Sequence, residues 1–278
     1  MDISVIIPTY NRKHTLKRAI QSVEQQSLPP SEIIVVDDGS NDGTEEWVKK
    51  NYPNVKYVYQ KNSGVSSARN EGIKISRGNW IALLDSDDEW LPNKIYKQTN
   101  EIQANSNIKI HHSNEIWIRN GVRVNQMKKH KKFGGHIFEK CLDMCRISPS
   151  SVLIKRDVFD DIGTFDESLI VCEDYNLWLR ITSKYSVFFL DVPLIIKYGG
   201  HNDQLSKAQN GIEFYRIQAL ENILKSKMLN KPQTLLTINM LIKKMYIYAK
   251  GLEKRNKVSE LSKVKKNIHH WINMMELY

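Results

Sequence analysis

The stretch WIALLDSDDEW, residues 80–90, joins an apolar segment directly to a cluster of acids. Residues 80–84 are wholly apolar, which is typical of a strand buried on both faces of a sheet. Four of the next five residues, Asp85, Asp87, Asp88 and Glu89, carry carboxylates. Like charges this close together repel one another unless a cation lies among them. The stretch therefore predicts a buried strand that ends at a cation-binding site.

Similar apolar segments recur upstream of this strand, and each is followed by a helical pattern. Strands are expected at residues 3–8, 32–36, 55–59 and 80–85, and a helix that Gly64 and Gly72 weaken at 63–75. Apolar strands that alternate with helices are typical of βαβ units. We therefore predict an α/β fold, with a Rossmann-like, mostly parallel sheet covered by helices on both faces.

After residue 108 the alternation of strands and helices stops. Residues 109–119 and 122–125 flank Asn120-Gly121, a hairpin turn signal, and further strands are expected at 150–154, 187–190 and 194–198. From residue 207 the pattern is helical to the end. We predict a main domain over residues 1–206, divided near residue 107 into halves 1–107 and 108–206, and a C-terminal helical appendage over 207–278.

The charge of the chain is concentrated in its last fifth. The formal net charge is +10, and residues 225–278 hold 12 basic and three acidic residues, which accounts for +9 of it. The part that carries the motifs is nearly neutral, which argues against nucleic acid as its partner. Three cysteines without a Cys-x-x-Cys pair predict reduced thiols rather than a disulfide scaffold or zinc ribbon.

Neither a leader nor a membrane span is expected. Met1 runs directly into a strand-like segment, and the longest charge-free apolar stretch, near 235–242, is too short to cross a bilayer. We expect a cytoplasmic protein, which would lie at the inner face of the membrane if it binds lipid.

Polar turns follow three of the predicted strands, at the sheet edge where α/β proteins bind ligands. These are residues 9–11, Asp37-Asp38 and the acidic cluster at 85–88. An acidic turn by itself is as often a helix cap as a binding site. The sequence lacks a dinucleotide fingerprint and a phosphate-binding Gly loop with its Lys, so the phosphates of a nucleotide would need a divalent metal. Asp-x-Asp at a strand end suits Mn²⁺ or Mg²⁺.

Five segments together resemble the family 2 glycosyltransferases of the GT-A fold. They are SVIIPTYNR (4–12), IIVVDDGSNDGT (33–44), NSGVSSARNEGI (62–73), WIALLDSDD (80–88) and EDYNLWLR (173–180). The resemblance covers residues 2 to about 206. It implies transfer of a sugar, with inversion, from a nucleotide diphosphate sugar to a glycan or lipid-linked acceptor. UDP is the nucleotide that the family favours, and synthesis of a surface polysaccharide or lipopolysaccharide is the pathway it suggests.

The resemblance also assigns roles to the donor-side residues. Beside the base and ribose it implies the first-strand turn, which consists of Pro8, Thr9, Tyr10 and Asn11. Asp38 would hydrogen-bond the base, and Arg69 would lie beside the nucleotide. Asp85 would lie near the ribose and the metal, and Asp87 would be the direct metal ligand. The metal would neutralise charge on the departing diphosphate.

An inverting transfer needs one base to take the proton of the acceptor hydroxyl. Within the family pattern Asp174 is the candidate base and Glu173 its neighbour or an acceptor contact, although an acidic pair at a helix start is by itself more often a cap. YGGHNDQLS (198–206) resembles the segment that closes the family's site, so His201 is a candidate ligand of the metal or diphosphate. A surface histidine in a turn is the alternative.

Three alternatives remain open at the level of sequence. The basic helical tail either packs on the main domain with a solvated face or contacts anionic lipid at a membrane surface. A nucleotidyltransferase also uses strand-end carboxylates and a metal, but IPTYNRKHT (7–15) is a poor phosphate loop. A nucleic-acid-binding protein that uses the tail would leave the acidic sheet edge unexplained.

Overall fold

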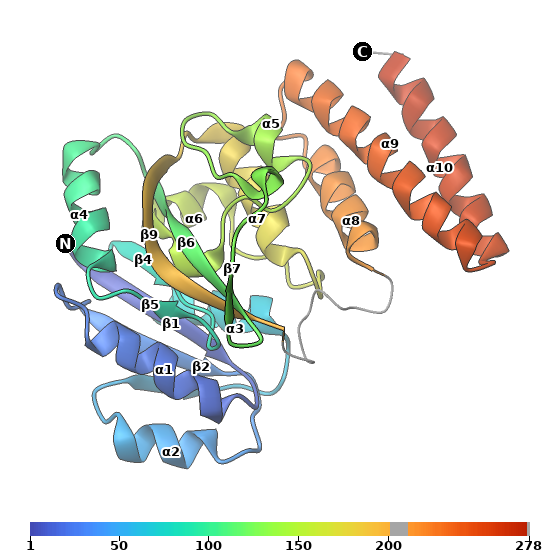
Figure 1. Cartoon of the computed structure of the whole chain (residues 1–278). Coiled ribbons are helices and arrows are strands. Elements are labelled where there is room, and N and C mark those ends of the chain that lie inside the picture. The colour runs from blue at the N-terminus through green and yellow to red at the C-terminus, as the bar shows by residue number, and fades with distance from the viewer. Residues whose placement is uncertain (201–210, 277–278) are drawn as a thin grey trace.

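A computed structural model describes residues 1–200 and 211–276 of the chain, and it confirms the predicted α/β class (Figure 1). The first half is a series of βαβ units: β1 (Ile3–Thr9), α1 (Lys13–Glu24), β2 (Glu32–Asp37), α2 (Thr44–Asn51), β3 (Lys56–Tyr59), α3 (Val65–Ile75) and β4 (Trp80–Leu83). Strands β3, β2, β1 and β4 are parallel neighbours in that order. Their carboxyl ends therefore meet at one edge of the sheet, as the sequence predicts.

The second half extends the same sheet with both parallel and antiparallel pairs. Its elements are β5 (Glu89–Trp90), α4 (Lys94–Ala104), β6 (Ile110–Arg119), β7 (Val122–Val124), η1 (Lys128–His130), α5 (Phe138–Cys141), η2 (Pro149–Ser151), β8 (Leu153–Lys155), α6 (Arg156–Ile162), α7 (Glu173–Lys184) and β9 (Phe188–Gly199). Strand β8 runs antiparallel to β4 and β6, whereas β6 and β9 are parallel. In the described residues the nine strands form one sheet, in which β7 pairs with β6 as the predicted hairpin.

Strand β9 differs from the sequence prediction, which places two separate strands at 187–190 and 194–198. The chain stays extended from Phe188 to Gly199, and the register against β6 shifts around Asn114. Asp191 and Pro193 interrupt the apolar pattern. The interruption produces a bulge rather than a turn, because a bulge accommodates an extra residue without ending the strand.

Helices cover both faces of the sheet, as predicted. On one face α1, α2 and α4 pack against apolar residues of β1, β2 and β4, among them Val5, Ile7 and Val35. On the other face α3 and α5–α7 enclose a larger core that contains Ile6, Leu83 and the fully buried Trp178.

The C-terminal helices belong to this second core. They are α8 (Ile212–Lys225), α9 (Lys231–Lys254) and α10 (Val258–Glu276), and α9 and α10 form an antiparallel pair at one end of the molecule (Figure 1). Leu220, Leu241 and Ile268, one from each helix, lie in the same apolar cluster as Trp178. The tail is thus packed on the main domain. No helix in the described part of the chain is long and apolar enough to span a bilayer.

Helix α3 approaches the sheet closely at Gly72. A Cβ at this position would collide with Ile6 Cγ2 of β1, and it would lie 3.3 Å from Val36 Cγ2 of β2. A glycine normally weakens a helix, but here it lets the helix axis approach the strands. Because α3 carries Arg69, this contact fixes the height of the arginine above the sheet.

We expect Gly72→Ala to lower the free energy of unfolding by about 1–3 kcal/mol, the usual cost of forcing an extra methyl group into a packed core. Gly251→Ala in α9 is the matched control, since its nearest heavy atom is the flexible Arg255 side chain at 3.4 Å. The control should be neutral or more stable by up to about 1 kcal/mol. Urea denaturation of both variants measures the difference, and equal stability would contradict the close-packing argument.

Candidate active site

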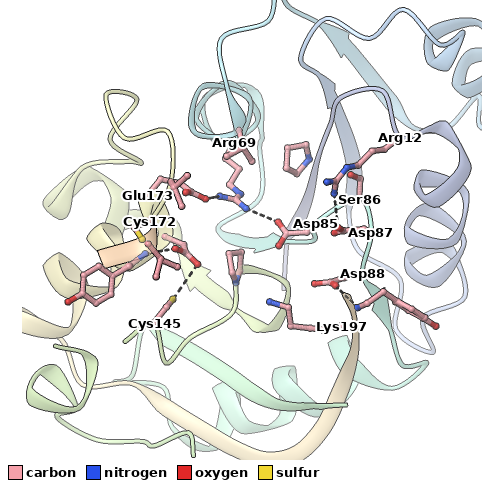
Figure 2. Close-up of a pocket in the computed structure, with 18 of the residues that line it drawn as sticks. Arg12, Arg69, Asp85, Ser86, Asp87, Asp88, Cys145, Cys172, Glu173 and Lys197 are labelled. Carbon is pink, nitrogen blue, oxygen red and sulfur yellow. Dashed lines mark hydrogen bonds and ion pairs between the residues drawn. The ribbon is translucent and has the colours of Figure 1, made fainter. Parts of the chain in front are cut away.

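A pocket of about 320 Å³ lies at the carboxyl ends of β1 and β4 and extends to the first turn of α7 (Figure 2). Six of the residues predicted from the sequence line it: Pro8, Arg69, Asp85, Asp87, Glu173 and Asp174. These residues come from positions as far apart as 8 and 174. The structure therefore brings together the two acidic motifs, one after β4 and one at α7.

Arg69 joins these motifs. Its side chain is 4% exposed, and its guanidinium donates to Asp85 Oδ1 and to Glu173 Oε1, each at 2.7 Å. Burial opposes the charged form of Asp85, but the ion pair with Arg69, together with the charges of Lys197 and Arg12, lowers the pKa of Asp85. Burial raises the pKa of Glu173 to about 7, an effect that Asp174 increases and Arg69 opposes. Arg69 thus fixes the distance between the two walls of the pocket.

The remaining acids after β4 point in different directions. Asp87 Oδ2 accepts a hydrogen bond from Arg12 at 2.6 Å, and the backbone carbonyl of Asp87 accepts one from Arg18. Asp88 turns into the protein and accepts from the Ser150 hydroxyl at 2.6 Å. Burial raises the pKa of Asp88 to about 8, since the residue is only 2% exposed. All three acids line the pocket, but the carboxylate of Asp88 is buried against Ser150, which leaves Asp85 and Asp87 as the more accessible pair.

The two acids at the start of α7 also have different roles. Cys172, just before the helix, has a left-handed backbone with φ of 65°, which turns the chain sharply into the first helical turn. Glu173 is buried against Arg69, whereas Asp174 is only partly buried and lines the pocket. Asp174 Oδ1 accepts from its neighbour's backbone N–H, and Oδ2 accepts from the Cys145 thiol at 3.3 Å. These two bonds orient a carboxylate that remains accessible from the pocket.

Four other predicted residues do not line this pocket and instead organise its edge. Asp38 accepts from the backbone N–H groups of Ser63 and Gly64, both at 2.8 Å, and so anchors the start of α3. Asn11, with φ of 50°, accepts from the backbone N–H of Asn41. Thr9 is buried beside Asp38 and Tyr10 is 48% exposed. Their predicted contacts with base and ribose remain predictions. His201 lies outside the described residues.

Sequence reasoning missed several cations of the pocket, among them Arg12, Lys197 and Arg216. Arg12 directly follows the predicted turn 8–11, so its position in the sequence could have indicated an arginine paired with the acids of the site. Lys197 lies in an otherwise apolar strand segment, IIKY, and a lysine in such a segment is a signal of a buried charge. Arg216 comes from α8, which the sequence places in the tail, and nothing in the pattern connects it with the site.

The residues present fit a divalent metal. Asp85 uses Oδ1 and Asp87 uses Oδ2 for their ion pairs with arginines, so the second oxygen of each is the one that a hard cation would take. Over residues 1–200 and 211–276, no three His, Cys, Asp or Glu side chains are grouped to enclose an ion. A metal held by Asp85 and Asp87 would therefore need further ligands from a substrate and water.

Comparison with known proteins identifies the family. The family model described as Glycosyl transferase family 2 matches residues 4–163. An uncharacterized glycosyltransferase of Rickettsia typhi is 34% identical over 221 residues, which are 77% of this chain and 69% of that protein. The Escherichia coli protein WfgD, named UDP-Glc:alpha-D-GlcNAc-diphosphoundecaprenol beta-1,3-glucosyltransferase, is 33% identical over 64% of this chain and 69% of its own. A Rickettsia bellii relative is 35% identical, but the match spans only 31% of it.

A solved structure shares the fold. Staphylococcus aureus TarS 1–349, solved in complex with UDP, superposes with a TM-score of 0.67 at 21% identity, over 87% of this chain and 71% of that chain. The likeness confirms the GT-A type of the sheet and its helices.

Proposed function

This chain belongs to glycosyltransferase family 2 and is a glycosyltransferase, and we propose that it is an inverting one. In this proposal the sugar moves from a nucleotide diphosphate sugar to a glycan or lipid-linked acceptor. One observation carries the proposal. A single pocket is lined on one wall by Asp85 and Asp87 and on the other by Asp174. Arg69 pairs with Asp85 and with Glu173, the neighbour of Asp174, and so holds the two walls together (Figure 2). The pair of Asp85 and Asp87 is suited to a donor diphosphate, and the single accessible carboxylate of Asp174 to the proton of an acceptor.

The reaction needs one displacement. The acceptor oxygen forms a bond to the anomeric carbon, the bond from that carbon to the β-phosphate oxygen breaks, and the nucleoside diphosphate leaves with the electron pair. Asp174 takes the proton of the acceptor hydroxyl. Glu173 is less suited to this role, because Arg69 occupies one of its oxygens and the side chain is buried. No covalent glycosyl-enzyme is needed in a single displacement.

For the cofactor we propose Mn²⁺ or Mg²⁺, held by Asp87 and Asp85. When bound, the metal supplies Lewis-acid stabilisation of charge on the diphosphate. The protein's own contribution is to hold these two carboxylates apart, through separate ion pairs with Arg12 and Arg69. His201 remains a further proposed ligand.

The halves of the main domain divide the substrates in this proposal. Residues 1–107 form the nucleotide-sugar half, with UDP as the expected nucleotide, and residues 108–206 form the acceptor half; residues 207–278 are the basic helical region. A lipid-linked acceptor in surface polysaccharide or lipopolysaccharide synthesis is supported by the name of the E. coli relative WfgD, which describes a diphosphoundecaprenol acceptor.

A thermal-shift and hydrolysis screen tests the donor. UDP-, GDP- and dTDP-sugars are added to the protein with Mn²⁺ or with EDTA, and one nucleotide class should raise the melting temperature and be hydrolysed slowly in Mn²⁺. If no nucleotide sugar stabilises the protein or is consumed with Mn²⁺ present, the proposed function is wrong.

We further propose that the outer face of α9 contacts an anionic membrane. Tyr246 and Ile247 are about half exposed there, and a shallow groove of about 400 Å³ beside them is lined also by Lys243 and Lys250. Apolar side chains flanked by lysines suit the boundary between lipid headgroups and acyl chains. This surface would bring the enzyme to a lipid-linked acceptor.

Lys243→Ala combined with Lys250→Ala should weaken binding to phosphatidylserine-containing vesicles by roughly thirtyfold, because each lysine contributes about 1 kcal/mol near an anionic surface. Vesicle co-sedimentation at physiological salt measures the change. Lys50→Ala with Lys61→Ala, two exposed lysines of the nucleotide half, is the matched control and should bind nearly as the parent does. Equal losses in both double variants would show that net charge alone governs binding and would contradict a role for the α9 face.

A further inference from the structure

Lys197 lines the side of the pocket that is formed by the end of β9 and Asp88, here called the floor. It lies near the end of β9, opposite Trp117 of β6, and its side chain extends below Asp85 and beside Asp88 (Figure 2). Four carboxylates act on it electrostatically, those of Asp88, Glu115, Asp85 and Asp174. Burial opposes the charge of this lysine, but these carboxylates outweigh it and raise the pKa of Lys197, so the side chain is an ammonium ion.

The ammonium of Lys197 differs from the other cations of the pocket in what it contacts. Arg69 donates to Asp85 and Glu173, Arg12 donates to Asp87, and Arg216 donates to Glu213. Among the residues that the structure describes, the Lys197 ammonium makes no side-chain hydrogen bond or ion pair, although four carboxylates act on it from a longer distance. Its three N–H donors are therefore available to a ligand in the pocket.

The acids around Lys197 have partners of their own. Glu115 is paired with the buried Lys132 at 3.1 Å, and Asp88 accepts from Ser150. Neither carboxylate depends on Lys197 for its direct contact. Because these acids already have direct partners, the charge of Lys197 is not needed to pair them, and its ammonium lines the pocket where a ligand can reach it.

The position of the ammonium selects the part of the donor that it would contact. Asp85 lies on the donor wall and Asp174 on the acceptor wall, and both act on Lys197. In an in-line displacement the β-phosphate, which carries the bond that breaks, lies on the donor side of the anomeric carbon and the base on the opposite side. Asp88 and Asp85, which follow β4 on the donor side, act more strongly on Lys197 than Asp174 does, so the ammonium lies toward the donor wall and is placed to reach the β-phosphate.

We propose that Lys197 donates hydrogen bonds to the β-phosphate of the sugar donor and stays bound to it as the nucleoside diphosphate leaves. This inference rests on the proposed function. Lysine is suited to this contact because its compact charge binds phosphate without a fixed geometry. Lys197 would act in addition to a metal at Asp85 and Asp87, from the floor of the same pocket.

Isothermal titration of the full-length protein with UDP and with UMP, each in Mn²⁺, tests the contact. Lys197→Met should lose about tenfold or more in affinity for UDP, the size expected of one charge-assisted hydrogen bond, and less than about twofold for UMP, which lacks the β-phosphate. Lys197→Arg, which keeps the charge, should recover most of the UDP affinity. If Lys197→Met does not fold, Lys197→Gln gives the same comparison with a polar side chain of no charge.

Lys132→Met is the matched control, because it removes the direct partner of Glu115 without lining the pocket. It should lower the melting temperature and leave the ratio of UDP to UMP affinity unchanged. The inference is overturned if Lys197→Met binds UDP as the parent does, if it loses UDP and UMP equally, or if Lys132→Met reproduces its loss. A parent protein that binds none of UDP, GDP and dTDP would overturn the proposed donor, and this contact with it.

Discussion

Asp174→Asn is expected to lower the rate of sugar transfer by roughly two orders of magnitude or more, the contribution of a positioned base, while affinity for donor and metal stays nearly unchanged. Asparagine keeps the size of the side chain and can still accept from the backbone N–H of Tyr175, but it cannot take a proton from the acceptor. The substitution is on the acceptor wall, away from Asp85 and Asp87, so the donor contacts should survive. Transfer kinetics with the identified donor, together with titration of the nucleoside diphosphate, separate the two effects.

Glu173→Gln is the matched comparison, because it tests whether the loss of transfer is specific to Asp174 or follows from the loss of either acid. The structure places Glu173 against Arg69 rather than in the open pocket, and glutamine can still accept from Arg69 at the same position. We expect a smaller loss of transfer than in Asp174→Asn. Full transfer activity in Asp174→Asn, or a product with retained anomeric configuration, would overturn the single-displacement mechanism.

The parts of this site that sequence could predict are those that follow a strand or a helix in a regular way. WIALLDSDD shows both the buried strand β4 and the acids at its end, since an apolar run and a charge cluster are visible without any knowledge of contacts. Parallel strands align their carboxyl ends, so the turns after β1, β2 and β4 had to meet. Asp174 was a weaker prediction, because an acid in a first helical turn has a simpler explanation as a cap.

The parts that sequence could not predict depend on contacts between distant elements. The partner of Glu173 is Arg69, 104 positions away, and nothing local indicates that one arginine serves both acidic motifs. Asp38 was assigned to the base from the resemblance, and the structure shows that it also anchors the loop before α3, a contact that no pattern in the sequence reveals. Arg216 reaches the pocket only because α8 packs back onto the main domain.

The opening cluster of acids illustrates the same limit. Its composition correctly indicates that cations must lie nearby, but the cations of the described structure are Arg12, Arg18, Arg69 and Lys197, which are spread over 186 positions of the chain. Charge repulsion within a turn can be relieved by side chains as well as by a metal, and sequence alone does not distinguish them. The proposed metal therefore needs a direct test.

Asp87→Ala provides that test, because it should abolish the part of donor binding that depends on metal while the protein stays folded. Asp87 is partly exposed at the pocket rim, and its ion pair with Arg12 joins side chains that are 16% and 22% exposed, so its loss should cost on the order of 1 kcal/mol of stability. The loss of a carboxylate that holds a divalent cation should be far larger, since the remaining Asp85 offers one oxygen beyond its pair with Arg69. Calorimetric titration of UDP, in Mn²⁺ and in EDTA, gives the metal-dependent ratio of affinities, and thermal melting reports the fold.

Arg12→Ala separates the metal from the ion pair, since both variants break the contact between Arg12 and Asp87 but only Asp87→Ala removes the carboxylate. Arg12 lines the pocket and its loss can weaken donor binding by itself, so the quantity to compare is the ratio of UDP affinities in Mn²⁺ and EDTA. That ratio should be retained in Arg12→Ala, because the carboxylate of Asp87 is then open to the cation, and should fall to about one in Asp87→Ala. If Asp87→Ala keeps the parent's ratio, the cation is not held at this turn, and the acids after β4 are balanced by the protein's own arginines and lysine.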